Sequence, residues 1–160
     1  MQNANIHRPA GHWPNEKAIG TLTLDFDARH RRRIRLTADH GQAVLLDLPK
    51  TVAMADGDGL QLNDGSWLRI RAAAEPLIEV RHADPHQLVR LAWHLGNRHL
   101  PTEIREDSLL IRPDHVIEDM LIGFRAALMK IEAPFQPEGG AYGSTQHDRH
   151  HHGQGGHHHE

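Results

Sequence analysis

The amino-acid sequence predicts an α+β protein with a small antiparallel β domain, a β-α-β-β-α-β domain and a histidine-rich tail. First, short segments between residues 18 and 73 alternate apolar and polar residues, the period of a strand. Second, two segments beyond residue 75 have the spacing of a helix. Third, seven of the last fourteen residues are histidine, and none of these fourteen residues has an apolar side chain that a core could bury. We therefore expect domains at 1–74 and 75–136 and a tail at 137–160.

The β domain is predicted from five apolar segments separated by turn signals. Residues 22–26 and 34–36 alternate as half-buried strands do. The arginines around residue 33 then lie on a solvated strand face, with a protein-docking patch as the alternative. Residues 43–48 (AVLLDL) form a nearly continuous apolar run, which is typical of a strand buried on both faces. Residues 60–62 and 67–70 flank an Asn-Asp-Gly-Ser turn and predict a hairpin.

The first helix is predicted after a strand at 77–80. Asp84 supplies an N-cap and Pro85 suits the first helical position. Gly96 is the expected left-handed residue that ends this helix. One apolar face is formed by Leu88, Leu91, Ala92 and Leu95.

The remaining elements complete a ferredoxin-like order. Residues 102–112 predict two short strands, and Pro113-Asp114 opens a second helix. Its apolar residues recur every four positions, at Val116, Met120 and Phe124. Residues 128–133 predict the last strand. The stretch FQPEGGAYGSTQ beyond Pro134 is expected to be a linker with little to bury, followed by a tail that is disordered without metal.

Composition excludes several classes of function. The chain has no cysteine, so neither disulfides nor thiolate metal sites are possible, and its net charge of −3 gives no bulk attraction to nucleic acid. It has no apolar run long enough to span a membrane and no secretion signal, so we expect a cytoplasmic protein. It has no phosphate-binding loop and no nucleophile elbow, so we do not expect an enzyme.

The tail is the strongest functional signal. Imidazole suits nickel, zinc, copper and cobalt, so histidines clustered on a loose chain predict metal capture rather than a purification tag. The tail histidines are His147, His150, His151, His152, His157, His158 and His159.

Two histidines outside the tail are candidate ligands. His99 lies between a helix end and Pro101, where a rigid loop can present an imidazole. One imidazole binds metal weakly, but a two-fold axis would bring two copies of His99 together. His115 begins the second helix. At both positions a surface residue and a ligand are about equally expected from the residues alone.

The other histidines give weaker signals. His82 and His86 are separated by Asp84-Pro85 and do not share a helix face, so we expect no joint metal site. His94 is expected to be a helix-end residue favoured by the helix dipole. Surface positions are expected for His7, His12, His30 and His40.

Three motifs in the second half are distinctive when they occur in this order. They are HLGNRHLP (residues 94–101), RPDHVIEDML (residues 112–121) and FQPEGGAYG (residues 135–143), followed by the histidine-rich end. Together they resemble the urease accessory nickel metallochaperone family, the E component of the urease maturation system. The first half agrees through LLDLPK, DGDGLQLNDG and RAAAEP.

This resemblance implies a peptide-binding-like β domain and a ferredoxin-like domain that dimerises and binds nickel(II). Zinc(II) stays open as an alternative, because imidazole accepts both metals. It implies that His99 is the central ligand, contributed by both subunits of a homodimer, and that His115 is a peripheral ligand. Some members carry a further histidine where this chain has Pro113. The implied partners are the GTPase of the maturation complex and apo-urease.

The resulting hypothesis is nickel delivery, in which two copies of His99 capture the metal and the tail histidines complete the shell. One alternative is a nickel or zinc buffer in which the tail stores metal. A second is a protein-binding adaptor whose metal only sets the dimer. A third, an RNA-binding ferredoxin-like domain, is disfavoured because segments 76–82 and 102–112 have no aromatic residue.

Overall fold

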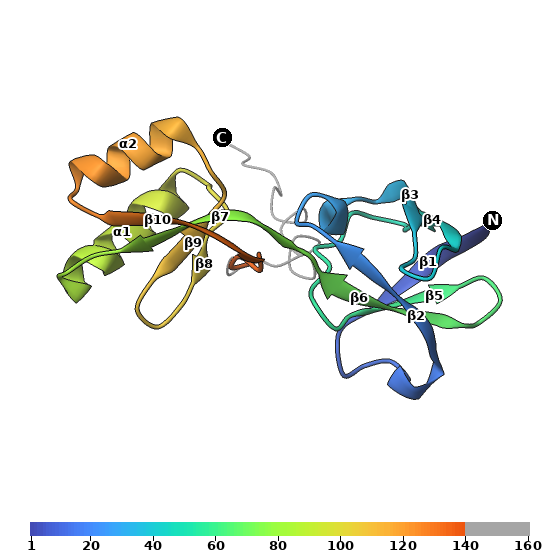
Figure 1. Ribbon diagram of the computed structural model, residues 1–160. Helices are drawn as coiled ribbons and strands as arrows, with labels where there is room; N and C mark the ends of the chain where they lie inside the picture. Colours follow the sequence, from blue (N-terminus) through green and yellow to red (C-terminus); the bar gives the residue numbers. More distant parts are fainter. Residues whose placement is uncertain (140–160) are drawn as a thin grey trace, which may run out of the picture.

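The computed structural model describes residues 1–139, which form two lobes joined where strand β6 passes into β7 (Figure 1). The N-terminal lobe has a six-stranded sheet in the order β2-β6-β5-β1-β4-β3. Its elements are β1 (Gln2–Arg8), the 3-10 helix η1 (Asn15–Lys17), β2 (Ala18–Leu24), the 3-10 helix η2 (Ala28–His30), β3 (Arg33–Thr37), β4 (Ala43–Asp47), β5 (Gly59–Leu62) and β6 (Trp67–Ala72).

The predicted N-terminal β domain is confirmed, with two features that the sequence pattern did not reveal. Strand β1 lies between β5 and β4 in the middle of the sheet, although its sequence QNANIHR is mostly polar and only Ala4 is fully buried. The pairs β1·β4 and β2·β6 are parallel, while the remaining pairs in this sheet are antiparallel.

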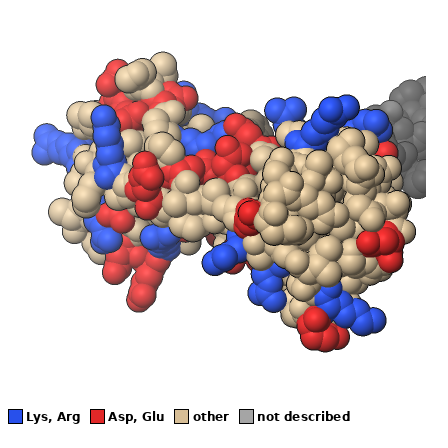
Figure 2. All heavy atoms as spheres, turned by 45° about the vertical axis from the view of Figure 1, so that its right-hand side comes forward, with Lys and Arg blue, Asp and Glu red and all other residues tan. Residues whose placement is uncertain are grey.

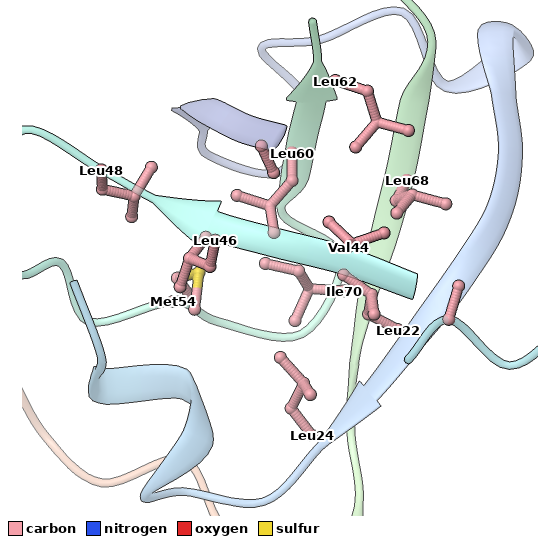
Figure 3. Packing of buried hydrophobic residues seen from close by; sticks show 12 residues of the cluster. Leu22, Leu24, Val44, Leu46, Leu48, Met54, Leu60, Leu62, Leu68 and Ile70 are labelled. Atoms are coloured by element: carbon pink, nitrogen blue, oxygen red, sulfur yellow. The ribbon is translucent and has the colours of Figure 1, made fainter. Parts of the chain in front are cut away.

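The core of this lobe comes from alternate residues of its strands (Figure 3). The expectation that residues 43–48 are buried on both faces is wrong: Val44 and Leu46 are buried, but Leu45 between them is only half-buried. The reason is that β4 packs one face against the core while its other face lies outside. Burial of each leucine side chain stabilises the lobe by about 1.5–3 kcal/mol. The residues drawn in Figure 3 include Leu22, Leu24, Val44, Leu46, Leu48, Met54, Leu60, Leu62, Leu68 and Ile70.

The C-terminal lobe has the predicted β-α-β-β-α-β order, and its sheet order β10-β7-β9-β8 is ferredoxin-like. Helices α1 and α2 cover one face of the sheet (Figure 1). The elements are β7 (Ala74–Arg81), α1 (Pro85–Asn97), β8 (Glu103–Ile104), β9 (Leu109–Ile111), α2 (His115–Gly123) and β10 (Ala127–Pro134). No helix within residues 1–139 is both long enough and apolar enough to cross a membrane.

Both helices begin as predicted. The side chain of Asp84 accepts a hydrogen bond of 2.9 Å from the backbone N–H of His86, and Asp114 accepts one of 3.1 Å from Ile117. The predicted apolar face of α1 is confirmed, since Leu91 and Leu95 are buried and Leu88 and Ala92 pack against the same cluster.

The predicted apolar face of α2 is wrong at two of its three positions, because only Met120 packs against the core cluster. Val116 is 70% exposed and Phe124 is also exposed, whereas Ile117 and Leu121 are buried in the core. The predicted residues and the buried pair Ile117 and Leu121 both have a four-residue spacing. Spacing alone could therefore not decide which set faces the core. The tertiary packing of Ile117 and Leu121 against Ile78 and its neighbours decides it.

The predicted end of α1 is also wrong. Gly96 lies inside the helix, which continues to Asn97 and is capped by Arg98. The residue with a left-handed backbone is His99, at φ 57°.

The stretch after β10 is not a linker with little to bury. Phe135 is fully buried, and it packs with Phe26, Leu77 and Leu110 at the junction of the lobes. The Phe135 ring lies 5.2 Å from the ring of Phe26 in the other lobe. Residues 135–138 therefore belong to the folded structure and fasten the two lobes together.

Candidate functional site

His99 occupies a Schellman motif at the end of α1. Its backbone N–H donates to the carbonyl of Gly96 at 3.0 Å, and the N–H of Leu100 donates to the carbonyl of Leu95 at 3.1 Å. Leu95 is buried and Leu100 packs against the same cluster, which is the apolar contact this motif usually includes. The backbone of His99 is thus fixed from both sides, while its side chain is exposed.

The backbone of His99 is strained, because its conformation is left-handed. A non-glycine residue in this region costs on the order of 1–3 kcal/mol, and such residues cluster at functional sites. Arg125 is the other described non-glycine residue with positive φ, at 63°. Strain alone therefore does not identify a ligand, but at His99 it coincides with an exposed imidazole.

His115 lies elsewhere in the lobe. It is the first residue of α2, is exposed, and lines a hollow that also includes Pro76, Glu118 and Glu132. His99 lines a different hollow, between the lobes. The two candidate ligands of the folded part are therefore not gathered in one pocket of a single chain.

Two further histidines, His82 and His94, contact other groups of the protein. The Nδ1 atom of His82 accepts from the backbone N–H of Asp84 at 2.9 Å, so its Nε2 carries the proton that is donated to the carbonyl of Phe124 at 3.1 Å. Both nitrogens of His82 are thereby used within the protein. The ring of His94 stacks on that of Phe124, with 5.0 Å between the centroids.

The hollow between the lobes contains a histidine that sequence reasoning had placed on the surface. His30 is half-buried at the end of η2, and it lines this hollow with His99 from the other lobe. Its Nδ1 lies 3.0 Å from the carbonyl oxygen of Phe26, and its ring lies 4.2 Å from that of Phe26. No local sequence signal could have shown that His30 and His99 line one hollow, because this depends on how the lobes meet.

Arg29 also lines this hollow. Its side chain is 2% exposed and donates to the carbonyl oxygens of Met54 and Phe135. Burial lowers the pKa of Arg29 from its ordinary value, and the negative charges of Glu75 and Asp25 act in the opposite direction. The arginine therefore links the N-terminal lobe to the segment that leads into the tail.

The segment before the tail is held by further hydrogen bonds. The backbone N–H of Gln136 donates to Glu103 at 2.8 Å, and its side-chain oxygen accepts from Asp56 at 2.9 Å. The N–H of Glu138 donates to the carbonyl of Thr102 at 2.9 Å. Gly139, the last described residue, lines the hollow that contains His99. The described part of the chain therefore ends at the hollow that His99 also lines.

Residues 1–139 contain no group of three or more histidine, aspartate or glutamate side chains close enough to hold a metal ion. The tail histidines lie outside the described residues; they are His147, His150, His151, His152, His157, His158 and His159.

One face of the molecule is shown in Figure 2, where acidic and basic side chains are interspersed over the C-terminal lobe and a broad area of the N-terminal lobe carries no charge.

Family models match almost the whole chain. The model for the N-terminal domain of the UreE urease accessory protein matches residues 3–73, and the model for its C-terminal domain matches residues 75–160.

Among similar proteins are urease accessory proteins UreE from two Bradyrhizobium strains and from Chelativorans. The protein of strain BTAi1 is 56% identical over 136 residues, which are 85% of this chain and 66% of that protein. That of strain ORS 278 is 57% identical over 132 residues, or 82% and 63%. That of Chelativorans strain BNC1 is 54% identical over 140 residues, or 88% and 89%. The chain thus spans slightly less than two thirds of the two Bradyrhizobium proteins.

Proposed function

Because this chain belongs to the family of UreE urease accessory proteins, we propose that it binds nickel(II) through histidines and delivers it for assembly of the urease active site. Membership supports an accessory role in urease maturation. In this proposal residues 75–136 hold the metal and the dimer contact, residues 137–160 supply further histidine ligands, and residues 1–74 act as a peptide-binding-like domain.

The observation that carries the proposal is the exposed imidazole of His99 on a fixed left-handed backbone. A ligand with a fixed backbone loses less conformational entropy when it binds metal. One such imidazole is weak, but two copies related by a two-fold axis form a shared site.

An apolar stripe on α1 supports a dimer contact near His99. Val89 and Trp93 are one helical turn apart, and they are 67% and 65% exposed. The same face continues to Gly96, one turn before His99. A large exposed aromatic side chain on a helix is a common feature of protein contact surfaces. Burial of this stripe between two copies of α1 would bring their His99 residues towards one axis.

The seven tail histidines complete the metal shell in this proposal. Tethered weak ligands have a high effective concentration near their point of attachment. Gly139 lines the same hollow as His99, so the tail starts at the hollow that the fixed ligand lines. A site with few fixed ligands also allows stepwise transfer, which a closed tetrahedral site would hinder.

His115 is proposed as a peripheral ligand. It is exposed at the start of α2, and Pro113 stands where a second peripheral histidine would be. Zinc(II) is an alternative occupant, since imidazole accepts both metals. The proposed setting is the cytoplasm and the proposed partners are a second copy of this chain, the GTPase of the maturation complex and apo-urease. Catalysis by the chain itself is not part of the proposal.

The test is a calorimetric nickel titration of the full chain, with the mass measured by light scattering. We would compare His99→Asn, which keeps a residue that tolerates the left-handed backbone, with a variant that has glutamine at all seven tail positions. Loss of the tightest site in His99→Asn and a weaker but remaining site in the tail variant would support delivery from a shared axis. Tight binding that survives in His99→Asn and vanishes in the tail variant would instead support storage by the tail.

A further inference from the structure

Strand β3 is an edge of the N-terminal sheet, with β4 on one side and no strand hydrogen-bonded on the other. The opposite edge is β2, and there Asp39 occupies the outward backbone. Its N–H donates to the carbonyl of Thr21 at 2.8 Å, and its carboxylate accepts from the N–H of Thr23 at 3.2 Å. In the described part of the chain, no hydrogen bond outside the β3–β4 ladder reaches the backbone of residues 33–37. Of the two edges, β3 is therefore the one with free backbone groups.

The register of β3 shows which groups these are. The strand pairs antiparallel with β4 along its whole length. Beyond its two ends, the N–H of Leu48 donates to the carbonyl of Arg32 at 2.9 Å, and the N–H of Ala38 donates to the carbonyl of Gln42 at 2.8 Å. In an antiparallel ladder only every second residue bonds to the partner strand. The even-numbered residues therefore bond to β4, and the N–H and carbonyl groups of residues 33, 35 and 37 point to the free edge.

The odd-numbered positions also carry a row of basic side chains. Arg33 and Arg35 are exposed, whereas Ile34 and Leu36 pack against the core. Arg31 precedes them with an extended backbone and is also exposed. Arginine thus recurs at every second residue, and at about 3.3 Å per residue the successive side chains leave the strand roughly 6.6 Å apart.

Only part of this positive charge is compensated within the lobe. Asp47 on β4 pairs with Arg33 at 3.1 Å and lies 3.9 Å from Arg32. Arg31 and Arg35 form no ion pair with any other residue in the range 1–139. The row therefore has two guanidinium groups that an external carboxylate can pair with.

The charges decide what can add to this edge. A second copy of β3 would place arginine opposite arginine, and like charges directly opposite each other destabilise a strand pair. A strand with carboxylates at every second residue has the same spacing and the opposite charge. Nucleic acid is the poorer fit, because β3 has no aromatic side chain on which a base could stack.

We propose that the free edge of β3 binds an extended acidic segment of a partner protein, which adds to the sheet as a further strand and places its carboxylates against Arg31, Arg33 and Arg35. Backbone hydrogen bonds supply the affinity, and the arginines select the partner by charge. This inference rests on the proposed function, because it names the site and the ligand class for the peptide-binding-like role of residues 1–74. It does not involve nickel.

The experiment is a titration of the full chain into a fluorescein-labelled peptide in which glutamate and valine alternate, followed by fluorescence anisotropy. One control peptide has lysine in place of glutamate and should not bind. A second has methylated backbone nitrogens, so it keeps the charge but cannot donate hydrogen bonds. Since each backbone hydrogen bond contributes a modest stabilisation, loss of several should weaken binding by at least about tenfold.

A charge reversal places the site on β3. Arg35→Glu puts a like charge opposite the glutamates and should weaken binding of the glutamate peptide by at least about tenfold. Arg8→Glu is the matched control, because Arg8 is exposed on β1 in the same lobe and the change in net charge is the same. It should weaken binding by less than about threefold, since exposed charges further away are screened.

Each outcome supports or overturns the inference. Equal affinity for the glutamate peptide and its methylated form would overturn strand addition. Equal binding by Arg35→Glu and Arg8→Glu would overturn the position on β3. Tighter binding of a short single-stranded RNA than of the glutamate peptide would assign the arginines to nucleic acid and overturn it as well.

The nickel titration of the same protein separates this inference from nickel delivery. A chain that binds nickel as proposed but does not bind the glutamate peptide would overturn the inference and leave nickel delivery intact. A chain that binds the peptide at β3 but has no tight nickel site would support the inference and contradict nickel delivery.

Discussion

His99 and Arg125 end the two helices of the C-terminal lobe in the same way. Each is the left-handed residue just beyond the helix cap, with φ of 57° and 63°. In each case the next residue donates its N–H to a carbonyl five residues earlier, Leu100 to Leu95 and Ala126 to Leu121. The two positions therefore have a similar backbone strain, but only His99 has a side chain that can bind nickel.

The first prediction concerns the stability of variants at His99. Because glycine avoids the clash of Cβ in a left-handed backbone, His99→Gly should be more stable than His99→Ala by about 1 kcal/mol. Urea unfolding measures the difference. Arg125 is the matched control: Arg125→Gly and Arg125→Ala should differ by a similar amount, with no effect on nickel binding. Equal stability of the two His99 variants would contradict the left-handed geometry.

The left-handed residue that ends α1 was predicted at Gly96 and lies at His99 for a physical reason. Gly96 is the residue type most often found at a left-handed helix end, and Pro101 follows it closely. The helix nevertheless continues, because the apolar pair that closes the motif is Leu95 with Leu100, which places the left-handed turn at His99. Histidine is among the residues that tolerate this conformation better than most.

The second prediction concerns Arg29 at the junction of the lobes. Arg29→Met would leave the carbonyl oxygens of Met54 and Phe135 without their donor, so we expect a loss of about 2–4 kcal/mol in the free energy of unfolding. Arg31→Met is the control, because Arg31 is exposed and should change stability by less than about 0.5 kcal/mol. Equal denaturation midpoints for the two variants would show that the arginine does not hold the lobes together.

The junction could not be predicted from sequence, whereas most strands and both helix starts could. Asp84 and Asp114 act within a few residues of themselves, so their capping role is visible in the local pattern. Arg29 and Phe135 are separated by 106 residues. Nothing near Phe135 indicates that it is buried, and this is why the segment after β10 was expected to be a linker. The position of His30 in the hollow was missed for the same reason.

The third prediction follows from the pKa of Asp58. Burial raises the pKa of this carboxyl group. Hydrogen bonds from His7 and from the backbone N–H groups of Ala55 and Ala10 together lower it by more, so the pKa lies below its ordinary value. The folded protein therefore favours the ionised form. Its stabilising contribution is present above the unfolded pKa of about 3.9 and is lost as pH falls through the lower folded value.

Asp58→Asn tests this contribution. Between pH 5.5 and pH 3 the urea midpoint of the unaltered chain should fall more than that of Asp58→Asn, so the two should converge in acid. Asp47→Asn is the control, because Asp47 is half-buried in an ion pair with Arg33 and its loss should have a smaller effect. A stability difference between the unaltered chain and Asp58→Asn that stays constant with pH would contradict the lowered pKa.

The fourth prediction concerns the apolar stripe of α1. If two copies meet at Val89 and Trp93, Trp93→Glu buries a charge in the contact, and the dimer should dissociate. Light scattering should then report the mass of one chain, 18.1 kDa. Ile19→Glu is the control, because Ile19 is 51% exposed on β2 in the other lobe and its substitution should leave the dimer intact. A dimer that survives Trp93→Glu would exclude this stripe as the contact.

The last prediction concerns the pH dependence of nickel binding. Protonated imidazole cannot bind metal, and free imidazole side chains titrate near pH 6.5. Between pH 7.5 and pH 5.5 the nickel affinity should therefore fall by about tenfold for each imidazole ligand. Because His99→Asn removes two ligands from a shared site, its affinity should depend less steeply on pH than that of the unaltered chain. His12→Gln, at an exposed position in the N-terminal lobe, should keep the original slope. An affinity that is nearly constant from pH 8 to pH 5.5 would contradict ligation by histidine and favour carboxylate or backbone oxygens, which keep their charge state over this range.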